Sequence, residues 1–165
     1  MPERETMVGA STGAGTGAEQ PSLLDEVVYE NCLERIDSLT PESPPRWGSM
    51  SVAQMLAHCA EVQEVMNGKP LEGTPWLLRL AGPLIKRAVL SRRPYRRGAR
   101  THPQYLQTSK KRFEPEKGRL LEALAAFRAA GAQGARHPLF GPLSAEEAGW
   151  GAFKHVDHHL RQFGA

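Results

Sequence analysis

Apolar residues recur with the period of an α-helix along most of this chain, and no segment shows the strict alternation of a half-buried β-strand. The periodic stretches are separated by short runs rich in proline and glycine, such as residues 40–45 (TPESPP) and 131–143. Proline lacks a backbone N–H and restrains the residue before it, so these runs end helices. The pattern predicts an all-α protein.

The caps of the expected helices can be placed in the sequence. Three serines at predicted helix starts are followed three residues later by an acid or an amide, the arrangement of a capping box: Ser22 with Asp25, Ser51 with Gln54, and Ser144 with Glu147. We expect four long helices, over residues 23–38, 51–67, 115–130 and 145–163. A further apolar segment, 75–90, is interrupted by Pro83 and forms either one kinked helix or two short ones.

Length and composition predict one domain. The chain has 165 residues, of which 40 % are hydrophobic, and this suits a single core. Residues 1–20 are rich in Gly, Ala, Ser and Thr, so we predict a disordered tail there and a folded domain over 21–165. The three tryptophans are expected in the core or in the wall of a pocket; they are Trp47, Trp76 and Trp150.

Charge and hydropathy narrow the expected partners and compartment. The net charge of +3 is too small to predict nucleic acid as a partner, and the arginines from Arg92 to Arg100 are expected in a solvated loop. No apolar stretch reaches the roughly 20 residues of a transmembrane helix, so no membrane partner is expected. The chain shows no signal-peptide pattern, and its lone cysteines, Cys32 and Cys59, are typical of buried thiols in a reducing compartment. We therefore expect a cytoplasmic protein.

The most informative run lies in the last predicted helix, where residues 154–163 read KHVDHHLRQF. His155 and His159 are one turn apart on one face, a spacing that lets both imidazoles reach one metal ion. Three small residues on the same face leave room for an ion, a water or a ligand: Ala148, Gly151 and Ala152. His158 lies to one side of this face and is expected to be more exposed.

His58 is the natural third ligand, because it lies on the inner apolar stripe of the second long helix between Met55 and Val62. Catalytic metal sites usually have three protein ligands and an open position. Spacing alone leaves two alternatives open, a three-histidine metal site and a hydrogen-bonded core histidine beside a chance HxxxH pair. Three neutral imidazoles suit Zn, Ni, Fe or Mn.

Two other kinds of histidine site are disfavoured. The run HVDHH has the spacing of the HExxH protease helix, but Val156 occupies the position of the glutamate that acts there as general base. The chain also lacks the Glu-x-x-His pairs of di-iron carboxylate bundles.

The stretches that carry these histidines resemble the DinB/YfiT-like superfamily. Residues 47–59, WGSMSVAQMLAHC, match the motif WGxMxxxQMLAHC of a domain-of-unknown-function branch of that superfamily. Residues 155–164, HVDHHLRQFG, match its ending HxxHHLRQFG. The resemblance extends from Pro21 to Ala165, and the two motifs together are specific.

The resemblance implies a four-helix bundle with up-down-down-up topology and a long crossover connection. It also implies a metal site made by one histidine of the second helix and the HxxxH pair of the last, which fall on His58, His155 and His159. The expected ion is Zn or Ni, with Mn or Fe as alternatives. Some members resemble metal-dependent S-transferases that use thiols such as mycothiol or bacillithiol, so a low-molecular-weight thiol is an expected cosubstrate.

Two classes of function remain open on this basis. The first is a metal-dependent transferase or hydrolase acting on a small molecule, with His158 as the candidate catalytic acid–base group. Asp157 points about 200° away from His155 on the helix and is expected on a solvated face. The second is a non-catalytic binding or stress-response module with a structural or vestigial metal. A homodimer is expected by analogy with similar bundles.

Overall fold

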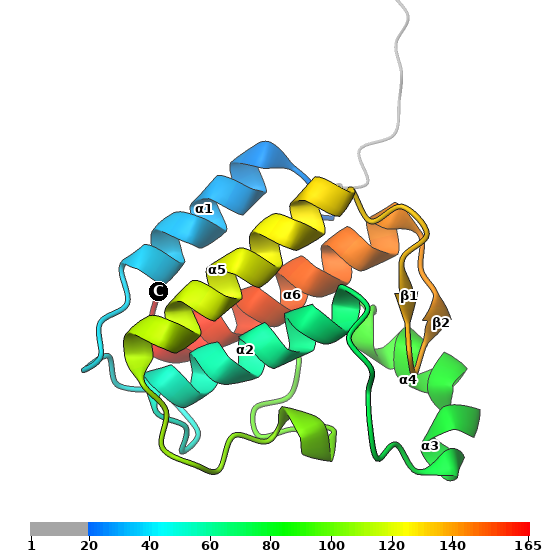
Figure 1. Cartoon of the computed structure of the whole chain (residues 1–165), viewed down its shortest axis with the longest axis horizontal. Coiled ribbons are helices and arrows are strands. Elements are labelled where there is room, and N and C mark those ends of the chain that lie inside the picture. Colours follow the sequence, from blue (N-terminus) through cyan, green and yellow to red (C-terminus); the bar gives the residue numbers. More distant parts are fainter. Residues whose placement is uncertain (1–19) are drawn as a thin grey trace, which may run out of the picture.

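Four long helices lie side by side in the computed structural model, which describes residues 20–165 (Figure 1). They are α1 (Glu26–Asp37), α2 (Val52–Met66), α5 (Phe113–Ala130) and α6 (Ala145–Phe163). The described chain is mostly helical, and this confirms the all-α class. The predicted tail, residues 1–20, lies outside the described residues except for its last residue.

The connection from α2 to α5 is long and contains three short elements: α3 (Trp76–Leu80), α4 (Gly82–Val89) and the 3-10 helix η1 (Pro103–Tyr105). A small antiparallel hairpin, β1 (Arg136–His137) and β2 (Gly141–Pro142), joins α5 to α6. In Figure 1, α2 and α5 run in one direction, and α1 and α6 run in the other.

Helix α2 is the most deeply buried element because it packs against α5, α6, η1 and β1 at once. Its residues Met55 and Leu56 join Leu124 of α5 and Leu160 of α6 in the main core cluster, and each of the four is at most 1 % exposed. Burial on several sides explains why α2 is apolar around most of its circumference. It also brings the side of α2 that carries His58 against α6.

Two of the three predicted capping boxes are confirmed. Ser51 and Ser144 each accept the N–H of the residue three positions later, and that residue's side chain accepts the serine N–H in return. The box at Ser22 is wrong, because α1 begins at Glu26 and is capped by Asp25, which accepts from the Val28 N–H at 3.1 Å. The reason is tertiary: the Leu23 N–H donates to the Gly149 carbonyl of α6, which holds the preceding chain outside the helix.

Proline positions account for the other differences from the expected elements. The segment 75–90 forms two short helices that meet at Ala81, with Pro83 in the first turn of α4, where its missing N–H costs nothing. Helix α5 starts at Phe113, two residues earlier than expected, because Pro115 is likewise tolerated in a first turn. The β1–β2 hairpin was not predicted, since two-residue strands give no alternating pattern.

Among residues 20–165, no helix has the length and apolar character needed to cross a bilayer.

Candidate metal centre

Three histidines converge where α2 faces α6. His58 comes from α2, and His155 and His159 come from successive turns of α6. One ring nitrogen from each lies within 4.8 Å of those of the other two, a grouping able to hold a metal ion. The Nε2 atoms of His58 and His155 are 3.1 Å apart. The packing of the two helices therefore unites the residues that the sequence singled out.

Hydrogen bonds behind the cluster orient two of the rings. His58 donates its Nδ1–H to the backbone carbonyl of Tyr105 at 2.8 Å, and His159 donates its Nδ1–H to the side-chain oxygen of Gln162 at 2.8 Å. A ring with a protonated Nδ1 keeps its lone pair on Nε2 when it is neutral. Both Nε2 lone pairs are thus available to a shared ion, in the manner of outer partners that fix histidine ligands.

The Gln162 amide is itself fixed by the chain that precedes α2. Its Nε2 donates to the Trp47 carbonyl at 2.8 Å, which leaves its oxygen for His159. The next residue, Gly48, has a φ of 81°, and a Cβ there would lie 2.8 Å from the Gln162 nitrogen. Glycine is favoured at residue 48 because of the positive φ and because of the lack of space for a Cβ. This gives a physical reason for the glycine that follows Trp47.

Burial keeps all three imidazoles neutral. Desolvation lowers the pKa of His58 below its ordinary value, against the opposing effect of the Tyr105 carbonyl. Desolvation and the neighbouring His159 and His58 lower the pKa of His155 further, and desolvation with His58 lowers the pKa of His159 to about 3. Neutral imidazole is the form that binds metals, so protons do not compete for these nitrogens near pH 7.

The donor set fits a divalent ion. Imidazole nitrogens bind zinc at about 2.0–2.1 Å, so two of them on one ion lie roughly 3.0–3.4 Å apart at the angles common in metal sites. The His58–His155 separation of 3.1 Å falls within that interval. Within residues 20–165 these three residues form the only group of three or more histidines, cysteines or carboxylates close enough to share an ion. A three-nitrogen set also leaves positions open for a substrate or water.

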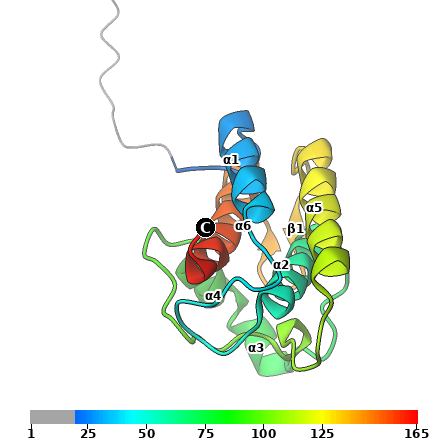
Figure 2. The same cartoon turned by 90° about the vertical axis from the view of Figure 1, so that its left-hand side faces the viewer.

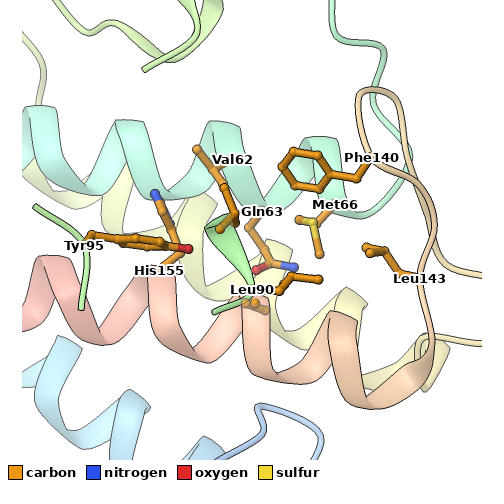
Figure 3. A pocket seen from close by; sticks show the side chains of 11 residues that line it. Val62, Gln63, Met66, Leu90, Tyr95, Phe140, Leu143 and His155 are labelled. Atoms are coloured by element: carbon orange, nitrogen blue, oxygen red, sulfur yellow. The ribbon is translucent and has the colours of Figure 1, made fainter. Parts of the chain in front are cut away.

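A pocket adjoins the cluster at His155, which is the one histidine of the three in its lining (Figure 3). Its cavity volume is about 70 Å³. Tyr95 lies with His155 at one end, and Phe140 and Leu143 lie at the other. The small residues Gly151 and Ala152 form part of its wall, in the place where the sequence predicted room for a ligand.

Lys154 holds the end of α4 over this pocket. Its ammonium donates to the carbonyls of Val89 and Ser91 at 2.7 Å each, and it lies 4.1 Å from the centre of the Tyr95 ring. The Trp150 indole adds a bond of 2.9 Å to the carbonyl of Leu90. These contacts bring the α4 end and Tyr95 into the pocket wall. Sequence reasoning missed Lys154, because lysines are seldom fully buried.

His158 and Asp157 lie outside the pocket lining. The half-buried His158 ring lies between those of Trp47 and Tyr95, at centroid distances of 5.8 and 5.5 Å, and its catalytic role stays a prediction. Asp157 was expected on a solvated face, and this is wrong. Its carboxylate is 14 % exposed and pairs with Arg35 of α1 at 2.9 Å, because α1 covers that side of α6.

The predicted setting of the tryptophans is also corrected. Trp47 and Trp150 are half-buried near the site, and the Arg97 guanidinium lies 4.3 Å from the centre of the Trp47 ring. Trp76 lies on α3 and is exposed, so it belongs neither to the core nor to the pocket. The buried thiols expected at Cys32 and Cys59 are confirmed as free, buried cysteines.

A substitution at Tyr105 tests whether the backbone carbonyl of this residue, and not its side chain, orients His58. Among the buried side-chain N and O atoms of the described residues, its hydroxyl is the one without a hydrogen-bond partner. We expect Tyr105→Phe to raise the free energy of unfolding by about 1 kcal/mol, because an unsatisfied buried group is removed. Metal affinity should not change, since His58 donates to the backbone carbonyl of residue 105. Urea unfolding and metal titration measure the two effects, and a destabilised variant would show that the hydroxyl has a partner such as water.

The fold and the cluster together define an all-α protein with three histidines placed to hold a metal ion. The family model of the DinB superfamily matches residues 25–163, a range that includes α1 to α6 and all three histidines. The chain belongs to the DinB superfamily, as the sequence resemblance indicated. No curated protein and no solved structure matched it.

Proposed function

We propose that the protein binds one divalent metal ion through the Nε2 atoms of His58, His155 and His159. The observation that carries the proposal is the convergence of three neutral imidazoles, two of which have their other nitrogen engaged by a carbonyl or amide oxygen. The third ring, that of His155, has its Nε2 3.1 Å from that of His58, so the two nitrogens already face one shared point. Three nitrogen donors favour Zn or Ni, and Mn or Fe are weaker alternatives.

We further propose that the site is that of a metal-dependent transferase or hydrolase. The pocket beside His155 supports this reading, because it would receive the reacting part of a small molecule next to the open positions of the ion. A bound ion would supply Lewis acidity that stabilises a thiolate or a hydroxide as nucleophile. The protein would supply the rest: apolar walls from Val62, Leu90 and Leu143 that exclude water, and a Tyr95 ring that closes one end.

The chemistry of the wall indicates the kind of substrate. Tyr95 and His155 are the only titratable side chains in the lining, so the pocket suits an apolar group and not a charged one. His158, beside His159 with rings 5.0 Å apart, is the nearest further imidazole for proton transfer. A low-molecular-weight thiol is the cosubstrate that we propose to test first.

A non-catalytic binding module is the second candidate. The same scarcity of titratable groups in the wall favours it, because general acid–base catalysis needs a proton donor or acceptor within reach of the substrate. In that case the ion would fix α2 to α6 and the pocket would only hold a ligand.

Elemental analysis of untagged protein tests the metal site. We expect close to one equivalent of metal in the wild type after incubation with Zn or Ni, and a loss of it in both His58→Ala and His155→Ala. His137→Asn is the matched control, since His137 lies on β1 outside the three-histidine group, and an asparagine there can still accept the Leu139 N–H, so the metal content should not change. A wild type that retains no metal would overturn the proposal.

Cobalt substitution separates the two candidate functions. A small thiol added to the Co²⁺ protein should produce a thiolate-to-metal charge-transfer band, which the matching alcohol should not produce. The protein's own thiols should not contribute, because burial raises the pKa of Cys32 to about 11 and that of Cys59 further still. Stoichiometric cobalt without a thiol band, and without turnover in a thiol-transfer screen, would favour the binding module.

A further inference from the structure

Large apolar side chains are exposed together on α3 and the start of α4. Trp76, Leu77, Leu80 and Leu84 are 61–73 % exposed, and we call these four residues the apolar patch. Trp76, Leu77 and Leu80 fall within about 100° of one another on α3, so they share one face. Soluble proteins seldom expose so many large apolar groups side by side without a binding function.

The patch lies within the most basic part of the chain. Residues 73–113 contain 11 of the 21 lysines and arginines and none of the 18 acidic residues. That stretch therefore carries a formal charge of +11, whereas the remainder carries −8. The modest net charge of +3, which was the reason for not expecting nucleic acid as a partner, conceals this asymmetry.

Exposed arginines border the patch directly. Arg79 precedes Leu80, and Arg87 lies three positions after Leu84, on the adjoining part of the α4 surface. Both side chains are exposed, and neither belongs to an ion pair among residues 20–165. Arg93 and Arg96 are exposed further along the same connection. Arg79 and Arg87 thus place two cations beside the apolar patch.

The surface is accessible because α3 and α4 lie at the edge of the molecule. In Figures 1 and 2 both helices lie outside the four long helices, and α3 is on the side remote from α1. No residue of α3 is buried, so burial in the core does not account for its apolar sequence. At the start of α4, Gly82 packs so closely against the carbonyl of Leu139, in the β1–β2 turn, that a Cβ at residue 82 would clash with it. The start of α4 therefore lies directly against that turn.

We propose that this basic apolar surface docks onto an anionic lipid bilayer, with the apolar patch entering the interface and the arginines meeting the lipid headgroups. Short amphipathic helices with tryptophan and leucine on one side and basic residues on the other bind in this way without spanning the membrane. The proposal replaces the expectation of no membrane partner, which rested on the absence of a spanning segment.

Charge decides against the other occupants. A two-fold contact between two copies through the patch would bring Arg79 and Arg87 against the same two cations of the second copy. Nucleic acid would engage the arginines but would leave the three leucines of the patch in water. A bilayer with acidic lipids satisfies both features of the surface at once.

Vesicle binding of the full-length, untagged chain tests the proposal. We expect co-sedimentation with vesicles of phosphatidylcholine and phosphatidylserine, weaker binding in high salt, and little binding to phosphatidylcholine alone. The double variant Leu80→Ser/Leu84→Ser should bind at least about tenfold more weakly. Val27→Ser is its matched control, since Val27 is 77 % exposed on α1, away from the patch.

A second pair of variants tests the charges. Arg79→Gln/Arg87→Gln should also weaken binding about tenfold or more, whereas Arg136→Gln on the exposed β1 strand should not. All these side chains are exposed, so an unchanged thermal midpoint is expected for each variant. The vesicle-induced change in tryptophan emission should disappear in Trp76→Phe.

Three outcomes would overturn the proposal. The first is no binding to anionic vesicles at low salt. The second is vesicle binding that the leucine variants do not change, because charge alone would then explain it. The third is a dimer in sedimentation velocity that the leucine variants dissociate, which would identify a second copy as the occupant of the patch.

Discussion

The metal-free protein is expected to be at least about 4 kcal/mol less stable to unfolding at pH 5 than at pH 7, because buried histidines, His137 and His159 foremost, resist protonation only while the chain is folded. Desolvation, with a smaller effect of His102, lowers the pKa of His137 to about 4. Desolvation and His58 lower the pKa of His159 to about 3. Each contributes about 2 kcal/mol to the difference.

The direction follows from which state binds the proton. At pH 5 a histidine in the unfolded chain, with its ordinary pKa near 6.5, is protonated, whereas His137 and His159 in the folded chain are not. Protons therefore favour the unfolded state. The stability is fully present above about pH 6.5 and is lost as the pH falls toward the folded-state pKa values.

Urea unfolding in the presence of a chelator, at pH 7 and at pH 5, measures this difference. His137→Asn separates the two contributions, because an asparagine oxygen can replace His137 Nδ1 as acceptor for the Leu139 N–H. The variant should lose about 2 kcal/mol less than the wild type over the same interval. Equal stability of the wild type at both pH values would show that neither histidine is held neutral.

The local part of this structure could be predicted from the sequence. Helical spacing placed His155 and His159 on one face, and it placed His58 on the inner side of its helix. The boxes at Ser51 and Ser144 fixed the starts of α2 and α6, because a capping box involves only four consecutive residues. Each of these features depends on contacts within one helix.

The features that the sequence did not predict depend on contacts between distant segments. The Tyr105 carbonyl reaches His58 from 47 positions away, and no periodic pattern indicates such a bond. Lys154 is buried because the end of α4 offers it two carbonyls, which is a property of the crossover connection. The exposure of Trp76 has the same origin, since α3 packs against α4 and not against the core.

Gln162→Leu is expected to weaken metal binding by about 10- to 100-fold, although it removes none of the three proposed ligands. The glutamine accepts the Nδ1–H of His159 at 2.8 Å and so directs the Nε2 lone pair toward His58 and His155. Leucine fills similar space in this buried position but accepts no hydrogen bond. The His159 ring would lose its fixed tautomer and orientation, and binding would then have to restore both.

Competition with a chromogenic zinc chelator measures the affinity, and Gln162→Glu is the informative control. Glutamate keeps an acceptor for His159 while it loses the donor that Gln162 offers to the Trp47 carbonyl. If orientation of His159 is what matters, the glutamate variant should bind metal nearly as tightly as the wild type. Equal losses in both variants would instead attribute the effect to the link with Trp47. Full affinity in Gln162→Leu would show that His159 either needs no support or does not ligate the ion, and His159→Ala distinguishes these two explanations.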